Sequence, residues 1–356
     1  MSGPLLVRNS CDVKALESEP LSSRYSASST YELLMQSAGK FADRATLVFL
    51  PQGLADEPAY TVSYAELFAR TTQAANAFSR LGVGRGDVVA FVLPNLPETH
   101  YIIWGGEAAG IIAAVNPLLE PRQILEILVA VNAKLLVTLG PDPAAPGLWE
   151  KVTAIAEDVP SLKAVLHIDI TKYFVSNWKP QSTAESRIGC VEVLNFDIEL
   201  DKEPSDQLLS GRAARPEDVA SMFHTGGTTG APKIAPHTHA NEVFMAWSLS
   251  SILGMAPGKT FLCGLPLSHV NAVLVTGLAE FMSGATVLMA GVQGYRSPKV
   301  LPSFWKLVER FRVNYFSAVP TIYARLLDVP VCDADISSLV YALCGAAPMP
   351  IDVFRK

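Results

Sequence analysis

Apolar runs and amphipathic stretches follow one another along the chain in an order that predicts alternating strands and helices. Residues 64–81 place apolar side chains on one helical face, and Ser63 and Glu66 have the spacing of a capping box. Residues 87–93 are almost continuously apolar, which is typical of a parallel strand covered by helices on both faces. The same alternation predicts helices at 97–109, from about 122 and between 139 and 163, and strands at 111–115, 135–138 and 164–168.

A second series of strands and helices begins near Pro216, after two polar, irregular stretches at 171–187 and 201–215 that we expect to be loops. Strands are predicted at 219–223, 260–265, 285–289, 313–318 and 340–344, with helices from about 238, 271 and 298. The pattern therefore predicts an α/β protein with two mainly parallel, doubly wound βα subdomains. We place an N-terminal extension at 1–29, the first subdomain with its linker at 30–215, and the second at 216–356.

Composition limits the class of protein. Apolar residues make up 49% of the 356 residues and charged residues 17%, which excludes a disordered or coiled-coil chain. The net charge of −6 comes without a cluster of Lys and Arg, so we expect no nucleic-acid partner. The most apolar stretches, 102–119 and 272–292, are interrupted by Glu107 and Glu280 and predict buried helix and strand pairs instead of membrane spans.

The cysteines and the N-terminus bear on the cellular compartment. The five cysteines are odd in number and never form a CxxC pair, and the N-terminal residues lack the sustained apolar segment of a signal peptide. We therefore expect a cytoplasmic protein with reduced thiols. Cys263 and Cys344 lie in apolar runs, where a cysteine most often acts as a small hydrophobic residue.

A segment rich in glycine and threonine, HTGGTTGAPK at 224–233, directly follows the strand predicted at 219–223. Glycines let the backbone approach a ligand closely, backbone N–H groups and threonine hydroxyls donate hydrogen bonds, and Lys233 supplies a cation, so the segment suits a polyphosphate. A flexible surface turn is the alternative for such a loop taken alone. A Walker A loop is disfavoured, because Pro232 and Ile234 flank Lys233 where that motif has Gly and Ser or Thr.

Residues 225–233, TGGTTGAPK, resemble the phosphate-binding signature TSGTTGxPK of the adenylate-forming superfamily, which includes acyl- and aryl-CoA synthetases, luciferases and peptide-synthetase adenylation domains. Gly226 replaces the usual Ser of that signature. Further segments in the expected order resemble the same family: HxN at 239–241, LPLSH at 265–269, VPTIY at 319–323 and GAAP at 345–348. The resemblance extends over about residues 30–356. Within the superfamily, the chain most resembles the acyl-CoA synthetases.

The resemblance implies two-step chemistry, in which a carboxylate attacks the α-phosphorus of ATP and coenzyme A then displaces AMP to give a thioester. It assigns the β- and γ-phosphates to Thr225, Gly226, Gly227, Thr228, Thr229, Gly230 and Lys233, and the adenine to Gly345, Ala346, Ala347 and Pro348. It also implies ATP, Mg²⁺ and coenzyme A as cofactors, with Thr228 as the metal contact. Lys233, Thr228 and His269 are the expected catalytic residues.

The resemblance places His269 near the carboxylate and the α-phosphate; a structural histidine at a strand end is the alternative. The family's acid pocket corresponds here to small and medium side chains, which are equally consistent with ordinary core: Asn271, Leu274, Val275, Gly277, Ser317, Ala318 and Cys344. No charged residue among them would hold an amino group, so we expect a fatty, cyclic or aryl acid. His239 and Asn241 are interpreted as a cap or loop anchor, and His224 is given no role.

The family's later segments do not occur in these 356 residues: the YGxTE segment with its Mg²⁺-binding Glu, the ribose-binding Asp of YxTGD, and the C-terminal domain with its adenylation Lys. We therefore expect the N-terminal portion of an acyl-CoA synthetase, which binds ligands but does not turn over. A non-catalytic nucleotide- or acid-binding module and another kind of adenylation domain are the alternatives. We expect a small-molecule acid as partner and leave a homodimer open.

Overall fold

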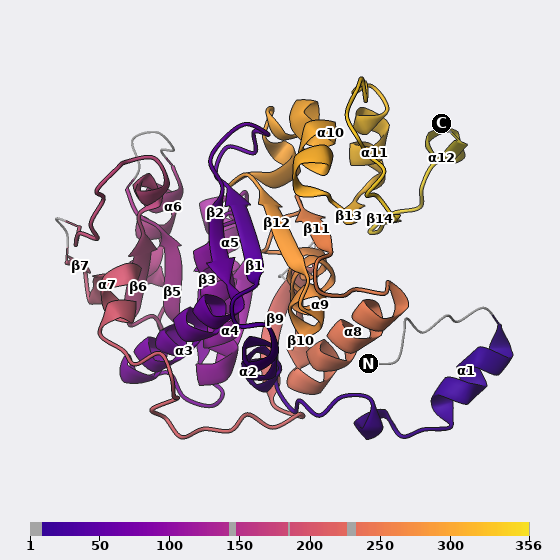
Figure 1. The fold of residues 1–356 in the computed structure, drawn as a ribbon. Helices are drawn as coiled ribbons and strands as arrows, with labels where there is room; N and C mark the ends of the chain where they lie inside the picture. The colour runs from indigo at the N-terminus through magenta and orange to yellow at the C-terminus, as the bar shows by residue number, and fades with distance from the viewer. Residues whose placement is uncertain (1–8, 142–146, 184–185, 226–232, 356) are drawn as a thin grey trace. The chain divides into compact units, whose positions relative to one another are not determined.

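The computed structural model describes residues 9–141, 147–183, 186–225 and 233–355, and Figure 1 labels their helices and strands. The chain divides into two compact units. The first contains Met1–Glu66, Ala240–Pro266 and Val270–Lys356, and the second contains Leu67–His239 and Leu267–His269. The units are therefore interleaved along the chain, whereas the sequence pattern predicted contiguous subdomains that meet near residue 216.

The second unit is built on a sheet whose described strands follow the order β10-β9-β4-β3-β5-β6-β8-β7. Neighbouring strands are parallel from β9 to β8, and the antiparallel strands β10 and β7 lie at the two edges. The strands are β3 (Val88–Val92), β4 (Ile111–Val115), β5 (Ala133–Leu139), β6 (Ala164–Ile168), β7 (Arg187–Ile188), β8 (Val191–Asn195), β9 (Val219–Thr225) and β10 (Lys233–Thr238).

Helices in the second unit cover the sheet and account for its apolar strands. Every residue of β3, β4 and β6 is buried, which confirms the prediction of strands packed on both faces. The helices are α3 (Tyr64–Arg80), α4 (Pro97–Ala109), α5 (Pro121–Ala130), α6 (Leu148–Thr153), η2 (Ala156–Asp158), η3 (Ile170–Tyr173) and α7 (Phe196–Asp201). The backbone N–H of Glu66 donates to the Ser63 hydroxyl at 3.1 Å, so the predicted cap does begin α3.

The first unit is built on a sheet with the described strand order β14-β13-β11-β12-β1-β2. Its strands are β1 (Ala45–Leu50), β2 (Tyr60–Ser63), β11 (Thr260–Cys263), β12 (Thr286–Ala290), β13 (Tyr315–Ala318) and β14 (Tyr341–Cys344). Strand β1 runs parallel to β12, beside which it lies in Figure 1, and antiparallel to β2. This pairing of β1 with β12 is the physical reason why the N-terminal residues belong to the same unit as the C-terminal ones.

The remaining helices belong mainly to the first unit. They are α1 (Ser10–Glu17), η1 (Leu21–Ser23), α2 (Thr30–Phe41), α8 (His239–Ile252), η4 (Asn271–Leu278), α9 (Ala279–Ser283), η5 (Gly294–Arg296), α10 (Val300–Phe311), α11 (Pro320–Leu326) and α12 (Ile351–Arg355). Helix α10 buries Val300, Phe304 and Leu307 against Leu288 of β12 and Phe316 of β13. Its apolar side chains recur every three or four residues, so one face of the helix covers the sheet.

Three features differ from the sequence-based expectations. Strand β10 was not predicted; it contains Pro236, which lacks a backbone N–H, and it is the edge strand of the described sheet, where a proline is tolerated. Strand β8 and helix α7 lie between the two stretches expected to be loops. Cys263 is 1% exposed as predicted, but Cys344 is exposed, because β14 is the edge strand of its described sheet.

None of the helices in the described part of the chain is both long and apolar enough to cross a membrane.

Candidate functional site

The two ends of the predicted phosphate-binding segment lie next to each other in the second unit. Thr225 ends β9, Lys233 begins β10, and the register of this antiparallel pair places them opposite one another. The Thr225 hydroxyl donates to the Lys233 carbonyl oxygen at 3.4 Å. Both residues are exposed. The other predicted phosphate contacts, Gly226, Gly227, Thr228, Thr229 and Gly230, lie outside the described residues.

His224, for which the motifs predicted no role, lies beside the end of a neighbouring strand. The backbone N–H of Asn116, which follows β4, donates to Nε2 of His224 at 3.2 Å. Burial lowers the pKa of His224, and the nearby His269 lowers it further. Asn116 and His224 are 108 residues apart in the sequence, so only the parallel pairing of β4 with β9 could have revealed this contact.

His269 belongs to the second unit together with Leu267 and Ser268. The backbone N–H of Leu267 donates to Oδ1 of Asn95 at 2.9 Å, which fixes this short segment to the residues that follow β3. His269 is exposed, yet partial desolvation of its imidazole lowers its pKa. The lowered pKa of each histidine favours the neutral imidazole, which offers one N–H donor and one acceptor without adding charge.

His239 was interpreted as a cap or loop anchor, and its backbone lies at such a position. It is fully buried and begins α8, and its backbone N–H donates to the carbonyl oxygen of Asp218 at 3.1 Å. Asp218 is in turn held by ion pairs with Arg85 and Arg215. The residues immediately before β9 and after β10 are thus tied together at the end of the hairpin opposite to Thr225 and Lys233.

A second group of predicted site residues gathers in the first unit, at the carboxyl ends of β13 and β14. The parallel register pairs Ala318 with Cys344, and the backbone N–H of Gly345 donates to the Ala318 carbonyl oxygen at 3.3 Å. A Cβ atom built on Gly345 would lie 3.7 Å from Nδ2 of Asn271, so the first residue of η4 is its neighbour. Ser317, which is 2% exposed, precedes Ala318 in β13. These residues lie at or beside the carboxyl ends of the strands, where ligands bind in open α/β folds.

The helix that follows His269 begins as predicted, but its first two turns are a π-helix. Within η4, Thr276 has non-helical dihedral angles of φ −120° and ψ 34°. Its hydroxyl lies 3.2 Å from the Ala272 carbonyl oxygen and 3.1 Å from Sγ of Cys263. Leu274 and Gly277 of η4 are buried and Val275 is half-buried, so the structure is compatible with both the pocket and the core interpretation. Short π-helical turns are frequent at functional sites.

The predicted adenine turn, residues 345–348, contains a backbone conformation that side chains disfavour. Ala346 has a φ of 67°, in the left-handed region. Ala346, Ala347 and Pro348 are all exposed. Upstream of the turn, the Tyr323 hydroxyl donates to the Leu343 carbonyl oxygen at 2.5 Å, which ties the VPTIY segment to β14. Both family segments are therefore physically connected in the first unit.

The structure thus brings the predicted residues together in two sets, and each set belongs to its own unit. Thr225, Lys233 and His269 lie in the second unit, and the acid-pocket and adenine residues lie in the first. Among the described residues, no group of three or more His, Cys, Asp or Glu side chains is arranged to hold a metal ion. Thr228, the predicted metal contact, lies outside these residues, so its role toward Mg²⁺ stays a prediction.

Comparisons with known proteins define the class. A family model described as AMP-binding enzyme matches residues 34–356, and the chain belongs to this family. It is 36% identical to the marinolic acid–CoA ligase of Pseudoalteromonas sp. (strain SANK 73390) over 98% of the chain and 51% of that protein. It is 28% identical to the 3-hydroxybenzoate–CoA ligase of Aromatoleum sp. (strain CIB) over 78% of the chain and 48% of that protein.

Solved structures show the same fold. The crystal structure of an anthranilate CoA ligase in complex with anthranoyl-AMP matches 95% of this chain and 58% of that one, with a TM-score of 0.75 and 21% identity. The N-terminal domain of FACL13 from Mycobacterium tuberculosis matches with a TM-score of 0.71 and 21% identity, over 92% of this chain and 72% of that one. The chain spans about half the length of the curated relatives it matches.

Proposed function

We propose that this chain provides the ATP-binding and acid-binding part of an AMP-forming acyl- or aryl-CoA synthetase, an acid–thiol ligase. The observation that carries the proposal is the family match over residues 34–356, within which every predicted motif occurs in order. The relatives are CoA ligases of aryl, long-chain and other carboxylic acids, which supports a carboxylic acid as substrate. We assign the complete synthetase activity to a longer protein, one that contains this chain together with segments that correspond to the rest of the relatives.

The role proposed for the second unit is to hold the polyphosphate of ATP. The pairing of Thr225 with Lys233 places the hydroxyl of one and the backbone of the other at the two ends of the glycine-rich segment. Lys233 is exposed and forms no ion pair with a described carboxylate, so its ammonium group is available to a phosphate. Charge builds up on phosphate oxygens in phosphoryl transfer, and a fixed cation with oriented N–H donors stabilises that charge.

His269 is proposed to orient the acid near the α-phosphorus, and His224 is proposed to support it. The pKa of each is lowered, which favours the neutral imidazole in the protein without ligand. A neutral His269 donates one hydrogen bond to the carboxylate without forming a fixed ion pair, so the carboxylate keeps its nucleophilic lone pair. The hydrogen bond from Asn116 defines which nitrogen of His224 is the acceptor.

The role proposed for the first unit is to hold the acyl group and the adenine. Asn271, Leu274, Val275, Gly277, Ser317, Ala318 and Cys344 are small or medium in size and carry no charge. A site of this kind suits a fatty, cyclic or aryl acid, because an amino acid would need a partner for its ammonium group. Gly345, Ala346, Ala347 and Pro348 are proposed to flank the adenine, with Ala346 and Ala347 exposed beside Gly345.

ATP and coenzyme A are the cosubstrates of the proposed reaction, and Mg²⁺ is expected to accompany the ATP. A cytoplasmic location, a role in fatty acid metabolism and a homodimer stay predictions. A non-catalytic nucleotide- or acid-binding module is the second candidate. The two candidates share the same binding residues and differ only in turnover.

The test has two arms. Calorimetry of the 356-residue chain with Mg-ATP, AMP and GTP measures whether a nucleotide site is formed, and a thermal-shift series with fatty, cyclic and aryl acids measures the acid class. We expect adenine nucleotides to bind more tightly than GTP. A longer protein that contains this chain is then assayed for acid-dependent, CoA-dependent release of AMP. Nucleotide binding without AMP release would favour the binding module, and no nucleotide binding by either protein would overturn both candidates.

A further inference from the structure

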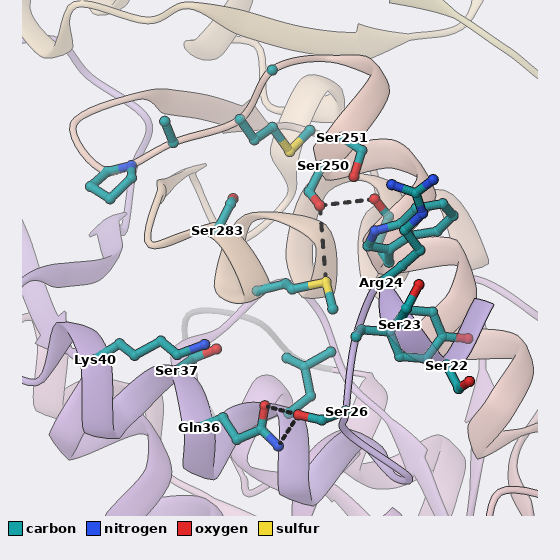
Figure 2. Close-up of a pocket in the computed structure, with 18 residues that line it drawn as sticks. Ser22, Ser23, Arg24, Ser26, Gln36, Ser37, Lys40, Ser250, Ser251 and Ser283 are labelled. Carbon is teal, nitrogen blue, oxygen red and sulfur yellow. Dashed lines mark hydrogen bonds between the residues drawn. The ribbon is translucent and has the colours of Figure 1, made fainter. Parts of the chain in front are cut away.

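A pocket in the first unit lies away from the predicted acid site. It is lined by the N-terminal segment, α2, the C-terminal end of α8 and the end of α9, and its volume is about 790 Å³ (Figure 2). Small-molecule sites range over roughly 300–1,000 Å³. Asn271 of the acid site begins η4, whereas Ser283 of this pocket ends α9, on the order of 15 Å further along the consecutive helices. We call this cavity the serine pocket.

The side chains that line the serine pocket are rich in hydrogen-bond donors. They include Ser22, Ser23, Ser26, Ser37, Ser250, Ser251, Ser283, Gln36, Arg24 and Lys40. No Asp or Glu is among the described residues that line it. A cavity that offers hydroxyls, an amide and two cations without a carboxylate favours a negatively charged occupant.

The two cations lie at opposite sides of the pocket, as Figure 2 shows. Lys40 is exposed toward the cavity and forms no ion pair with any carboxylate in the described ranges. Arg24 pairs with Glu19 at 3.1 Å, but the Glu19 side chain is 59% exposed. An exposed pair of this kind contributes little to stability, so a more highly charged ligand can replace Glu19 at Arg24.

Ser37 provides an independent indication of a ligand. It lies in α2, faces the pocket and is only 4% exposed, and its hydroxyl makes no hydrogen bond within the described part of the chain. By contrast, Ser283 donates to the Ala279 carbonyl oxygen at 3.0 Å, and the Gln36 amide donates to Ser26 at 3.2 Å. The Ser37 hydroxyl oxygen is accessible from the pocket although the rest of the residue is buried, so it can donate to a ligand oxygen there. Ser22 and Ser251 also line the pocket, and neither hydroxyl pairs with a described residue.

Carbon surfaces complete the wall of the serine pocket, through Tyr25, Leu33, Trp247, Met255 and Met282. We infer that the serine pocket binds a small organic anion with phosphate groups at both ends of a hydroxyl-bearing carbon skeleton, of the sugar bisphosphate class. One phosphate lies at Lys40 and Ser37, and the other lies at Arg24 and Ser22. The hydroxyls between them contact Gln36 and Ser251, and the carbon skeleton packs on Trp247.

Calorimetry with fructose 1,6-bisphosphate as the probe tests this inference on the 356-residue chain, with fructose 6-phosphate and fructose for comparison. We expect the bisphosphate to bind at least about tenfold more tightly than the monophosphate, because each phosphate gains charge-assisted hydrogen bonds. Lys40→Gln and Ser37→Ala should each weaken bisphosphate binding, the first by about fivefold or more. Lys163→Gln changes net charge equally at an exposed position in the other unit and should leave the affinity unchanged.

The same experiment separates the serine pocket from the proposed nucleotide site. Lys233→Gln should leave bisphosphate binding unchanged, since Lys233 does not line the pocket. Wild-type affinity in both Lys40→Gln and Ser37→Ala, or no saturable binding up to about 10 mM, would overturn the inference. Loss of binding in Lys233→Gln with retention in Lys40→Gln would overturn it too, because the probe would then occupy the phosphate-binding segment.

Discussion

Thr225 and Lys233 are paired opposite one another across the antiparallel strands β9 and β10. The pairing uses backbone groups and the Thr225 hydroxyl, and the ammonium group of Lys233 takes no part in it. The strand pairing at Lys233 therefore does not depend on the charge of its side chain. This separation allows a substitution to remove the charge while the strand pairing persists.

Replacing Lys233 with Gln should change nucleotide binding without changing the fold. The free energy of unfolding should stay within about 0.5 kcal/mol of the wild type, because the side chain is exposed and forms no ion pair with a described residue. The affinity for ATP should fall by about tenfold or more, since a charge-assisted contact to phosphate is lost. Denaturant unfolding and calorimetry measure the two quantities. Equal loss of stability and affinity would show that Lys233 has a structural role instead.

His269→Gln should slow adenylation while leaving ATP binding intact. The glutamine side chain keeps a hydrogen-bond donor but changes its position relative to the acid, so acid-dependent pyrophosphate exchange should fall by about tenfold or more. The measurement uses a longer protein that contains this chain. Lys163→Gln is the control with an unchanged rate. Exchange at the wild-type rate in His269→Gln would mean that His269 serves only as a surface residue near Asn95.

Ala346→Gly should stabilise the first unit. The φ of 67° at Ala346 is costly for a residue with a Cβ atom and costs a glycine nothing extra, so we expect a gain of about 0.5–1 kcal/mol in the free energy of unfolding. Ala347→Gly is the matched control, because Ala347 has no positive φ and should lose stability by a similar amount. Equal destabilisation by both substitutions, measured with urea, would contradict the strain argument.

Glu280→Gln should flatten the pH dependence of stability. Glu280 is fully buried in α9 and its carboxyl oxygens have no hydrogen-bond partner on another described residue, so burial raises its pKa well above 4.5. The folded state then holds a proton that the unfolded chain releases above its own pKa. The contribution of Glu280 to the free energy of unfolding is fully present below about pH 4.5. It is lost as the pH rises through the pKa of Glu280 in the folded protein.

The advantage of Glu280→Gln over the wild type should therefore grow between about pH 4 and pH 7, as measured by urea unfolding at each pH. Glu66→Gln, an exposed position at the start of α3, is the control and should show no such trend. A constant difference between Glu280→Gln and the wild type over this interval would show that Glu280 is ionised in the folded protein.

His100→Phe should protect the second unit against acid. Burial lowers the pKa of His100 from 6.5 to about 3, so the ring stays neutral in the folded protein while the unfolded chain takes up a proton below pH 6.5. The contribution of His100 to the free energy of unfolding is fully present above pH 6.5 and is lost as the pH falls toward 3. We expect the wild type to lose more free energy of unfolding than His100→Phe between about pH 7 and pH 4. Parallel pH profiles would contradict the buried, neutral state.

Strands and helices with local signals were predictable from the sequence. The apolar run that became β3 and the Ser63 cap of α3 depend on neighbouring residues alone. The partners of the strands were not predictable in the same way, because the pairing of Leu47 with Val287 joins distant segments. The short polar strand β10 lacked an apolar pattern, and Thr276, the non-helical residue of η4, contacts Cys263 of the distant strand β11.

The candidate site divides in the same manner. Lys233 and Gly345 were found from short motifs that carry their own spacing. The contact of His224 with Asn116, at the end of another strand, is one that no local pattern indicates. Cys344 was interpreted as core because its neighbours are apolar, yet its position on an edge strand leaves it exposed. Motifs thus supplied the candidate residues, whose roles stay predictions, and the pairing of distant strands determined the environment of each group.

The pairing of β1 with β12 also has a consequence for how the protein folds. The Thr286 hydroxyl donates to the Ala45 carbonyl oxygen across a sequence separation of 241 residues, so closing this contact carries a large loop entropy. Nearly all of the second unit, by contrast, lies in the continuous segment Leu67–His239. On the ribosome most of the second unit is synthesised first, and β1 stays without its parallel partner until β12 has emerged. During that interval β1 is an apolar strand with an open edge, which exposes it to pairing with other chains.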